Sequence, residues 1–144
     1  MIRKVSIKDA KYLRDITAEE LGYDVTLELM ERHIKKLGVD EEKHFIIVYE
    51  KEEIGIPIGY VHAELYESIY SEPMFNVLGL AVTKHCQTSG VGRALMEALE
   101  EEAKRRNLVG IRLNSSEKRM NAHQFYEHIG YISDKKQKRF LKVF

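Results

Sequence analysis

The segment Phe75–Asn107 constrains the fold more than any other part of the chain. Its first part, Phe75–Val82, is a short apolar run, which is typical of a strand buried on both faces of a sheet. Gly90 and Gly92 follow, and two glycines this close together let the backbone turn tightly. Beyond them, apolar residues recur three and four positions apart with charges between, which predicts an amphipathic helix. The segment is therefore expected to form a strand, a glycine turn and a helix.

A glycine turn at the start of a helix is suited to phosphate, because the first N–H groups of a helix lack partners and lie at its positive end. Two common phosphate-binding patterns do not fit this turn. The dinucleotide fingerprint requires a glycine where Leu95 stands, and no Gly-Lys-Ser/Thr follows as in a P-loop. From the residues alone, an ordinary strand-to-helix connection remains open.

Size and composition favour a single soluble domain spanning residues 1–144. Lys and Arg number 23, as do Asp and Glu, and the formal net charge of zero argues against a general nucleic-acid binder. The one cysteine, Cys86, excludes an internal disulfide and fits a reducing compartment. No apolar run approaches the roughly 20 residues needed to span a membrane. We therefore expect a cytoplasmic protein with neither a membrane nor a nucleic acid as partner.

The remaining patterns predict a mixed sheet covered by helices, an α/β (α+β) fold in the order β-α-α-β-β-β-α-β-α-β-β. Strands are expected at Ile2–Ile7, Phe45–Tyr49, Ile58–Tyr66 and Gly110–Leu113, helices at Ala10–Gly22, Leu27–Gly38 and Ala122–Gly130, and a closing hairpin at Tyr131–Ser133 and Arg139–Phe144.

Two motifs resemble those of the GCN5-related N-acetyltransferases, the GNAT family. Gln87-x-x-Gly90-x-Gly92 is similar to the family signature Q/R-x-x-G-x-G/A, and Asn121–Tyr131 resembles the pattern N-x-x-A-x-x-x-Y-x-x-x-G-F in its later part. The resemblance implies a mixed, mostly antiparallel central sheet flanked by helices. It also implies an acyltransferase that moves an acetyl group from acetyl-coenzyme A to a primary amine of a small molecule or peptide, by direct attack in a ternary complex.

The resemblance also implies which residues bind the coenzyme. In the family, the turn holds the pyrophosphate, the preceding strand hydrogen-bonds the pantetheine arm, and a main-chain N–H of that strand polarises the thioester carbonyl. The corresponding positions are Leu80, Ala81, Val82, Gln87, Thr88, Ser89, Gly90, Val91, Gly92, Arg93, Asn114, Asn121 and Tyr126. For Asn114 and Asn121, roles as plain turn or cap residues remain open.

Tyr126 is the expected general acid. Family members often have a tyrosine at this position near the coenzyme sulfur, where it can protonate the departing thiolate. A phenol pKa near ~10 suits a proton transfer to a thiolate. Tyr126 also lies on the apolar stripe of its predicted helix, so a structural role in the core remains open.

The general base is the point at which the sequence departs from the family pattern. Many members have a glutamate on the central strand, but Phe75–Thr83 contains no carboxylate. Glu64 is the substitute proposed from the sequence, together with His62, which shares its strand face two residues away. Glu67 and Glu72 come next. Ordinary surface charge, or a water path to no single base, remains open.

No pairing of histidines and the cysteine has metal-ligand spacing, so no metal is expected. Two alternative functions follow from the same residues. One is a coenzyme A-binding module of this fold without turnover, suggested by the missing strand carboxylate, and the other is a different nucleotide-binding α/β protein. Exposed strands near the C-terminus would also allow a homodimer. No motif identifies the amine acceptor.

Overall fold

The structure is a computed structural model that describes residues 1–87 and 89–144. The chain divides into two compact units, residues 1–113 and 114–144, and each is described by itself. The single domain expected over residues 1–144 remains a prediction.

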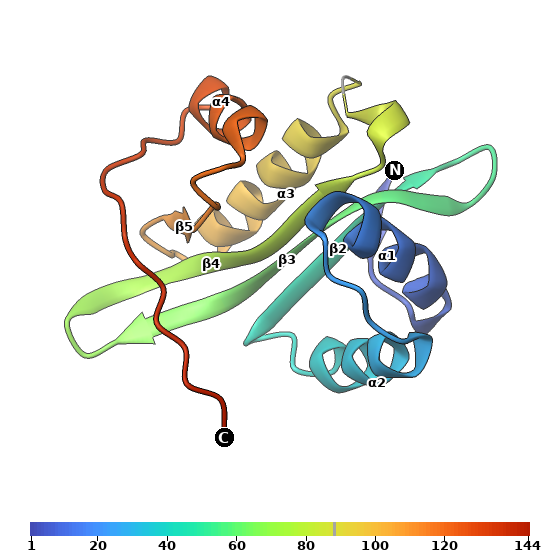
Figure 1. The fold of residues 1–144 in the computed structure, drawn as a ribbon, viewed down its shortest axis with the longest axis horizontal. Helices are drawn as coiled ribbons and strands as arrows, with labels where there is room; N and C mark the ends of the chain where they lie inside the picture. Colours follow the sequence, from blue (N-terminus) through green and yellow to red (C-terminus); the bar gives the residue numbers. More distant parts are fainter. Residues whose placement is uncertain (88) are drawn as a thin grey trace. The chain divides into compact units, whose positions relative to one another are not determined.

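A five-stranded sheet in the order β1-β2-β3-β4-β5 forms the centre of the first unit (Figure 1). The strands are β1 (Ile2–Lys4), β2 (His44–Lys51), β3 (Ile56–Ser68), β4 (Ser71–Val82) and β5 (Ile111–Leu113). Neighbouring strands are antiparallel from β1 to β4, whereas β5 runs parallel to β4. A mixed, mostly antiparallel sheet confirms the fold class expected from the sequence.

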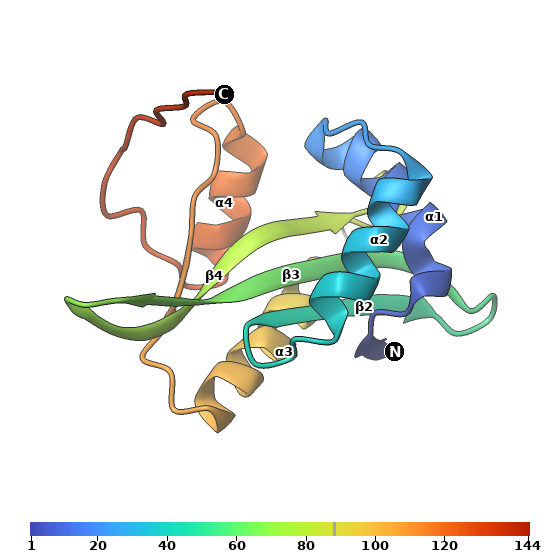
Figure 2. The same cartoon turned by 90° about the horizontal axis from the view of Figure 1, so that it is seen from below.

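Helices cover both faces of this sheet (Figure 2). On one face lie α1 (Ala10–Ile16), the short π-helical turn η2 (Thr17–Leu21) and α2 (Leu27–Gly38). On the other face lies α3 (Val91–Arg105), which packs on β2, β3 and β4.

Alternation along the strands gives each face its own core. Val48, Tyr60 and Ala81 point to the α1/α2 face, where they cluster with Ala10, Leu13, Ile16 and Ile34. On the α3 face, Phe75 is fully buried, as are Leu95, Met96 and Leu99 of the helix. Removing one such side chain from water contributes about 1.5–3 kcal/mol, so both faces help to hold the sheet.

Local signals explain where the N-terminal helices begin. A capping box follows β1, in which Ser6 and Asp9 each accept a hydrogen bond from the other's backbone N–H. Thr26 caps α2 by accepting a hydrogen bond from the Leu29 N–H at 3.1 Å. Among the described residues, no helix combines the length and apolarity that crossing a membrane requires.

The second unit contains α4 (Met120–His128), which ends before Gly130 at a left-handed φ of 100°. The closing hairpin expected at Tyr131–Ser133 and Arg139–Phe144 is wrong, because residues 129–144 form neither helix nor strand. A two-stranded hairpin is marginal in water without an apolar surface to pack on. The apolar side chains that would supply one, including Ile132 and Phe140, are exposed instead.

Candidate active site

At the glycine turn between β4 and α3, Gly90 is the N-cap residue of α3 and has no side chain to cap the helix. Gly90 precedes the helix with a left-handed φ of 85°, a conformation that favours glycine. Its carbonyl accepts from the Ala94 N–H at 3.0 Å. Among the described residues, no side chain caps α3, and its first turn holds no acidic residue. The backbone N–H groups of Val91, Gly92 and Arg93 therefore remain available to an anion.

Gln87 shapes this turn through two hydrogen bonds from its side-chain amide. Its side-chain amide donates to the carbonyl of Val82 at 3.0 Å and to the carboxylate of Glu20 at 2.6 Å. The first bond fixes the end of β4, and the second joins the turn to η2. Nearby, the Ser89 hydroxyl donates to the Cys86 carbonyl. Both side chains, which the sequence suggested as coenzyme contacts, thus have partners of their own.

The other turn residues differ in exposure. Val91 and Gly92 are buried in the first turn of α3. Arg93 is exposed and pairs with Glu97 at 3.2 Å, one helical turn away. Thr88, also an expected contact, lies outside the described residues.

A β-bulge interrupts β4 immediately before the expected thioester site. On β3, His62 pairs with Gly79 and the next residue, Ala63, pairs with Val77, so Leu78 has no partner on that strand. Bulges of this kind bend a strand and locally disrupt its ladder. The Leu78 side chain is half exposed, at 51% of its accessible surface.

The edge of β4 beyond the bulge is open on the side of β5. Within residues 1–113, β5 pairs with β4 only from Phe75 to Val77. From Leu78 to Val82, the N–H and C=O groups on this edge have no strand partner, and among them the Val82 carbonyl is held by Gln87. The side chains of Ala81 and Val82 are buried. Leu80, Ala81 and Val82 can therefore meet a ligand through backbone atoms at this edge.

A row of polar side chains crosses the sheet beside the bulge. Glu64, Asn76 and Arg112 lie in register on β3, β4 and β5. The Asn76 amide donates to the Glu64 carboxylate at 2.9 Å, and Arg112 donates to the Asn76 carbonyl oxygen at 2.8 Å. The guanidinium also lies 4.6 Å from the centre of the Tyr66 ring. Glu64, the base candidate from the sequence, is thus held by a neighbouring amide.

This row lies on the α1/α2 face of the sheet. Glu64 and Tyr66 alternate along β3 with Ala63, and they share a face with Tyr60, which belongs to the α1/α2 core. Asn76 likewise alternates with Phe75 and Val77, whose side chains are buried on the other face. The uncapped end of α3 and the polar row are therefore reached from opposite faces of the sheet.

His62 is the ionisable residue in register with the bulge. Its Nε2 lies 3.0 Å from Nδ1 of His44, so one ring donates a hydrogen bond to the other. Burial, together with nearby His44, lowers the pKa of His62 to about 4, although Glu64 opposes the shift. His62 is consequently neutral at physiological pH.

A buried pair of hydroxyls, which no sequence pattern indicated, adjoins the bulge. The Tyr60 and Thr17 hydroxyl oxygens lie 2.6 Å apart, which links β3 to η2. Burial raises the pKa of Tyr60. A Cβ placed on Gly79 would lie 3.7 Å from the Tyr60 hydroxyl and 3.5 Å from Leu21. This contact leaves little room for any side chain larger than a methyl group at Gly79.

In the second unit, Tyr126 lies on α4 among other aromatic rings. Its ring packs edge-on against Phe125 and Tyr131, with centroids 5.2 and 6.0 Å away. Burial raises the pKa of the Tyr126 hydroxyl, and the charge of Arg119 partly opposes this. Within residues 114–144 the hydroxyl has no hydrogen-bond partner. Asn114 and Asn121, the other expected contacts in this unit, are exposed.

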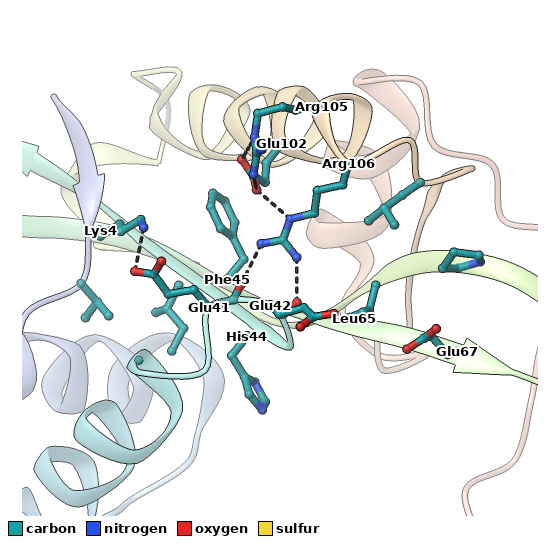
Figure 3. Close-up of a pocket in the computed structure, with 15 residues that line it drawn as sticks. Lys4, Glu41, Glu42, His44, Phe45, Leu65, Glu67, Glu102, Arg105 and Arg106 are labelled. Atoms are coloured by element: carbon teal, nitrogen blue, oxygen red, sulfur yellow. Dashed lines mark hydrogen bonds and ion pairs between the residues drawn. The ribbon is translucent and has the colours of Figure 1, made fainter.

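A separate cavity of about 630 Å³ lies beside the opposite end of α3 (Figure 3). At its wall, Arg106 donates to the backbone carbonyls of Glu42 and Glu41 at 2.7 and 2.8 Å and pairs with Glu102 at 2.7 Å. A hydrogen bond from Arg105, with further help from Arg106, lowers the pKa of Glu102 to about 2. At ~1.5 Å per residue, α3 separates this cavity from the glycine turn by roughly 20 Å. The three Lys and Arg side chains of the cavity all form ion pairs, Lys4 with Glu41 and both arginines with Glu102, which suits a structural role.

Among the described residues, no group of three or more His, Cys, Asp or Glu side chains could hold a metal ion.

Comparison with solved structures finds the same fold in several acetyltransferases. An aminoglycoside 6'-N-acetyltransferase from Acinetobacter haemolyticus has a TM-score of 0.83 and 16% identity, covering 100% of this chain and 99% of that chain. Glucosamine-6-phosphate N-acetyltransferase from Arabidopsis thaliana has a TM-score of 0.77 and 21% identity, with 100% and 97% covered. AAC(6')-Iy in complex with the bisubstrate analogue CoA-S-monomethyl-acetylneamine has a TM-score of 0.84 and 12% identity, with 100% and 98% covered.

These identities establish the shared fold only, and a search of curated proteins finds no match to the sequence. The family itself is established by a sequence model described as "Acetyltransferase (GNAT) family", which matches residues 10–131. The chain therefore belongs to the GNAT family of acetyltransferases and is an acyltransferase that uses acetyl-coenzyme A.

Proposed function

We propose that the protein transfers the acetyl group of acetyl-coenzyme A to a primary amine of a small molecule or peptide, by direct attack in a ternary complex. One observation carries the proposal. The open edge of β4 from Leu78 to Val82 leads along the chain to the uncapped first turn of α3. Backbone donors along an edge and at a helix start suit an extended ligand with a phosphate at one end.

The residues of this region fit the coenzyme. The N–H groups of Val91, Gly92 and Arg93 would hold the pyrophosphate, and the absence of acidic side chains from the described first turn favours an anion there. The backbone of Leu80, Ala81 and Val82 would bind the pantetheine arm. Gln87 and Ser89 would support the turn through their own hydrogen bonds. When bound, the coenzyme supplies an activated acetyl thioester.

A general base would remove the proton of the amine. The attacking nitrogen must be neutral, so a base has to remove a proton from the ammonium form. Glu64 is the proposed base, because it lies beside the bulge and Asn76 orients its carboxylate while leaving one oxygen without a hydrogen bond in residues 1–113. His62 is closer in register to the bulge, but its lowered pKa makes it a weak proton acceptor.

Tyr126 is the proposed acid. Its raised pKa keeps the hydroxyl protonated at neutral pH, and that hydroxyl has no partner within its own unit. It would give its proton to the leaving sulfur. Asn114 and Asn121 are proposed to line the pantetheine arm. We also propose that the protein is cytoplasmic and that it forms a homodimer.

The named activities of structural neighbours support a small-molecule amine as the acceptor. One neighbour is an aminoglycoside 6'-N-acetyltransferase and another is a glucosamine-6-phosphate N-acetyltransferase. Both names describe amines on sugar frameworks. For this chain, the choice among such amines depends on the face that carries α1, η2 and the polar row.

Thermal unfolding with acetyl-coenzyme A, coenzyme A, NAD or ATP tests the coenzyme site. A ligand at about 100 times its Kd adds about 2.7 kcal/mol, which raises Tm by several degrees in a chain of this size. We expect shifts with the two coenzymes only. Thiol release in an amine panel then tests transfer. Coenzyme binding without turnover of any amine would favour a binding module, and a shift with NAD or ATP instead would contradict the site.

A further inference from the structure

We propose that the acceptor carries an anionic group, such as a phosphate or carboxylate, in addition to its reacting amine, and that Arg112 binds that group. The inference rests on the proposed function and adds the chemical class of its acceptor.

Arg112 differs from the other half-buried arginines of the first unit. Arg3, Arg14 and Arg106 each pair with a carboxylate. Within residues 1–113, Arg112 has no carboxylate partner, and its one hydrogen bond goes from Nη1 to the Asn76 oxygen. The donors on Nε and Nη2 are therefore free in this unit. Arg112 is only half-buried, and these two nitrogens are not among the buried polar atoms that lack a partner, so they face solvent and can bind an acceptor that a ligand supplies.

The surroundings of Arg112 suit a planar anion contact. The Tyr66 ring lies 4.6 Å from the guanidinium carbon, and Asn76 holds one of its nitrogens. These two contacts limit the rotamers of a long side chain that would otherwise lose much entropy on binding. A guanidinium held in this way can offer two N–H groups to a phosphate or carboxylate in the bidentate geometry that makes such contacts strong.

The polar row also has a charge order that fits an acceptor with two charged ends. Glu64 is negative on β3, Arg112 is positive on β5, and the Asn76 amide joins them. An ammonium group is attracted to the Glu64 end and an anion to the Arg112 end. A polycation would instead place a positive charge beside Arg112, and the resulting repulsion would weaken its binding.

The register gives the expected length of the acceptor. Asn76, which pairs with Arg112, is two residues from Leu78 at the bulge, or roughly 7 Å at about 3.3 Å per residue. Tyr66, over which the guanidinium lies, pairs with Met74, two residues further from the bulge. The anion should therefore lie roughly 7–13 Å from the reacting nitrogen.

The test measures equilibrium binding to the protein saturated with coenzyme A. The probes are ω-aminoalkyl phosphonates of increasing chain length, alkylamines of matching length, and the polycation kanamycin. We expect phosphonates whose charges are roughly 7–13 Å apart to bind at least about 10-fold more tightly than their matched alkylamines. Arg112→Gln should abolish this preference, Arg112→Lys should keep part of it, and Arg105→Gln, at the far end of α3, should not change it.

The wild-type comparison keeps the test decisive even if Arg112→Gln folds poorly. Equal or tighter binding of the alkylamines or kanamycin by the wild type would overturn the inference, as would an undiminished phosphonate preference in a folded Arg112→Gln. Turnover of the same probes separates the two claims. If the alkylamines, which carry no anion, are acetylated as well as the phosphonates, the proposed function is supported and the Arg112 inference is contradicted. Anion-dependent binding without acetylation of any probe would support the Arg112 site and contradict the proposed transfer.

Discussion

Substituting Gly92 by aspartate tests directly whether the start of α3 binds the coenzyme pyrophosphate. Gly92 is the second residue of α3 and is not among the glycines with a positive φ, so its backbone accepts other residues. A carboxylate in the first turn interacts favourably with the helix dipole, by about 0.3–1 kcal/mol. The added charge should therefore not unfold the helix. Coenzyme binding is the property that is expected to change.

The size of the effect follows from the charges. A carboxylate about 4 Å from a phosphate charge costs about 1 kcal/mol in bulk water and about 4 kcal/mol at an effective dielectric of 20. Ser89 and Gly90 are exposed whereas Gly92 is buried, so the effective dielectric lies between these two limits. With two phosphate charges, the expected loss is at least about 2 kcal/mol, or more than 10-fold in Kd.

Gly92→Asn is the matched control, because asparagine has nearly the same shape as aspartate without the charge. Calorimetric titration with acetyl-coenzyme A should show Gly92→Asp binding at least about 10-fold more weakly than Gly92→Asn, with the gap narrowing at high salt. S-acetylpantetheine, which lacks the pyrophosphate, should bind both variants equally. Similar affinities of the two variants for acetyl-coenzyme A would refute the assignment of the phosphate site to this turn.

Three further predictions concern the acid, a buried histidine and the Arg106 cluster. Tyr126→Phe should lower kcat clearly while leaving the Kd of acetyl-coenzyme A nearly unchanged, as measured by thiol release and titration; an unchanged kcat would assign Tyr126 to packing alone. Because the folded pKa of His62 is lowered from 6.5 to about 4, its contribution to stability is complete above pH 6.5 and is lost as pH falls toward 4. Urea unfolding should show a loss of up to about 3 kcal/mol over this range, which His62→Gln should remove; an identical pH slope in that variant would contradict the assignment. Arg106→Gln should lower the free energy of unfolding by about 2–4 kcal/mol, because two backbone carbonyls lose their donor and Glu102 keeps only Arg105. The exposed Arg105→Gln should cost less, and an equal cost would argue against the carbonyl contacts.

Structural features that depend on residues close together in the sequence could be predicted from the sequence. The change from a short apolar run to a helical period marked the strand, turn and helix between Phe75 and Asn107. The helix expected at Leu27–Gly38 has the same bounds as α2. Such signals lie within a few residues of one another, so they do not depend on how distant strands pair.

The polar row could not be predicted in the same way, because it depends on strand register. Asn76 and Arg112 are 36 residues apart and meet only because β5 pairs with β4 at those positions. In the sequence, each is a single polar residue within an apolar run. The Tyr60–Thr17 bond, between residues 43 apart, escaped prediction for the same reason.

The closing hairpin was predicted wrongly because apolar residues alone do not make a strand. Residues 139–144 include four apolar side chains, Phe140, Leu141, Val143 and Phe144, yet a strand also needs a partner and a surface to cover. Phe140 and Phe144 are exposed, so within its unit this segment has neither a partner strand nor an apolar surface to pack on.

The bulge at Leu78 determines where β4 can lose a residue. Before it, Phe75 and Val77 face α3, whereas after it Gly79 and Ala81 face the α1/α2 core, although all four are odd-numbered. One extra residue thus exchanges the faces of every later side chain in the strand. Deleting Leu78 would let Gly79 follow Val77 directly and pair with His62 as before, so Ala81 would stay opposite Tyr60 on the α1/α2 face. The deletion would remove only the local bend that the bulge gives the strand. The strand should therefore tolerate the loss of Leu78 better than the loss of any residue that pairs with β3.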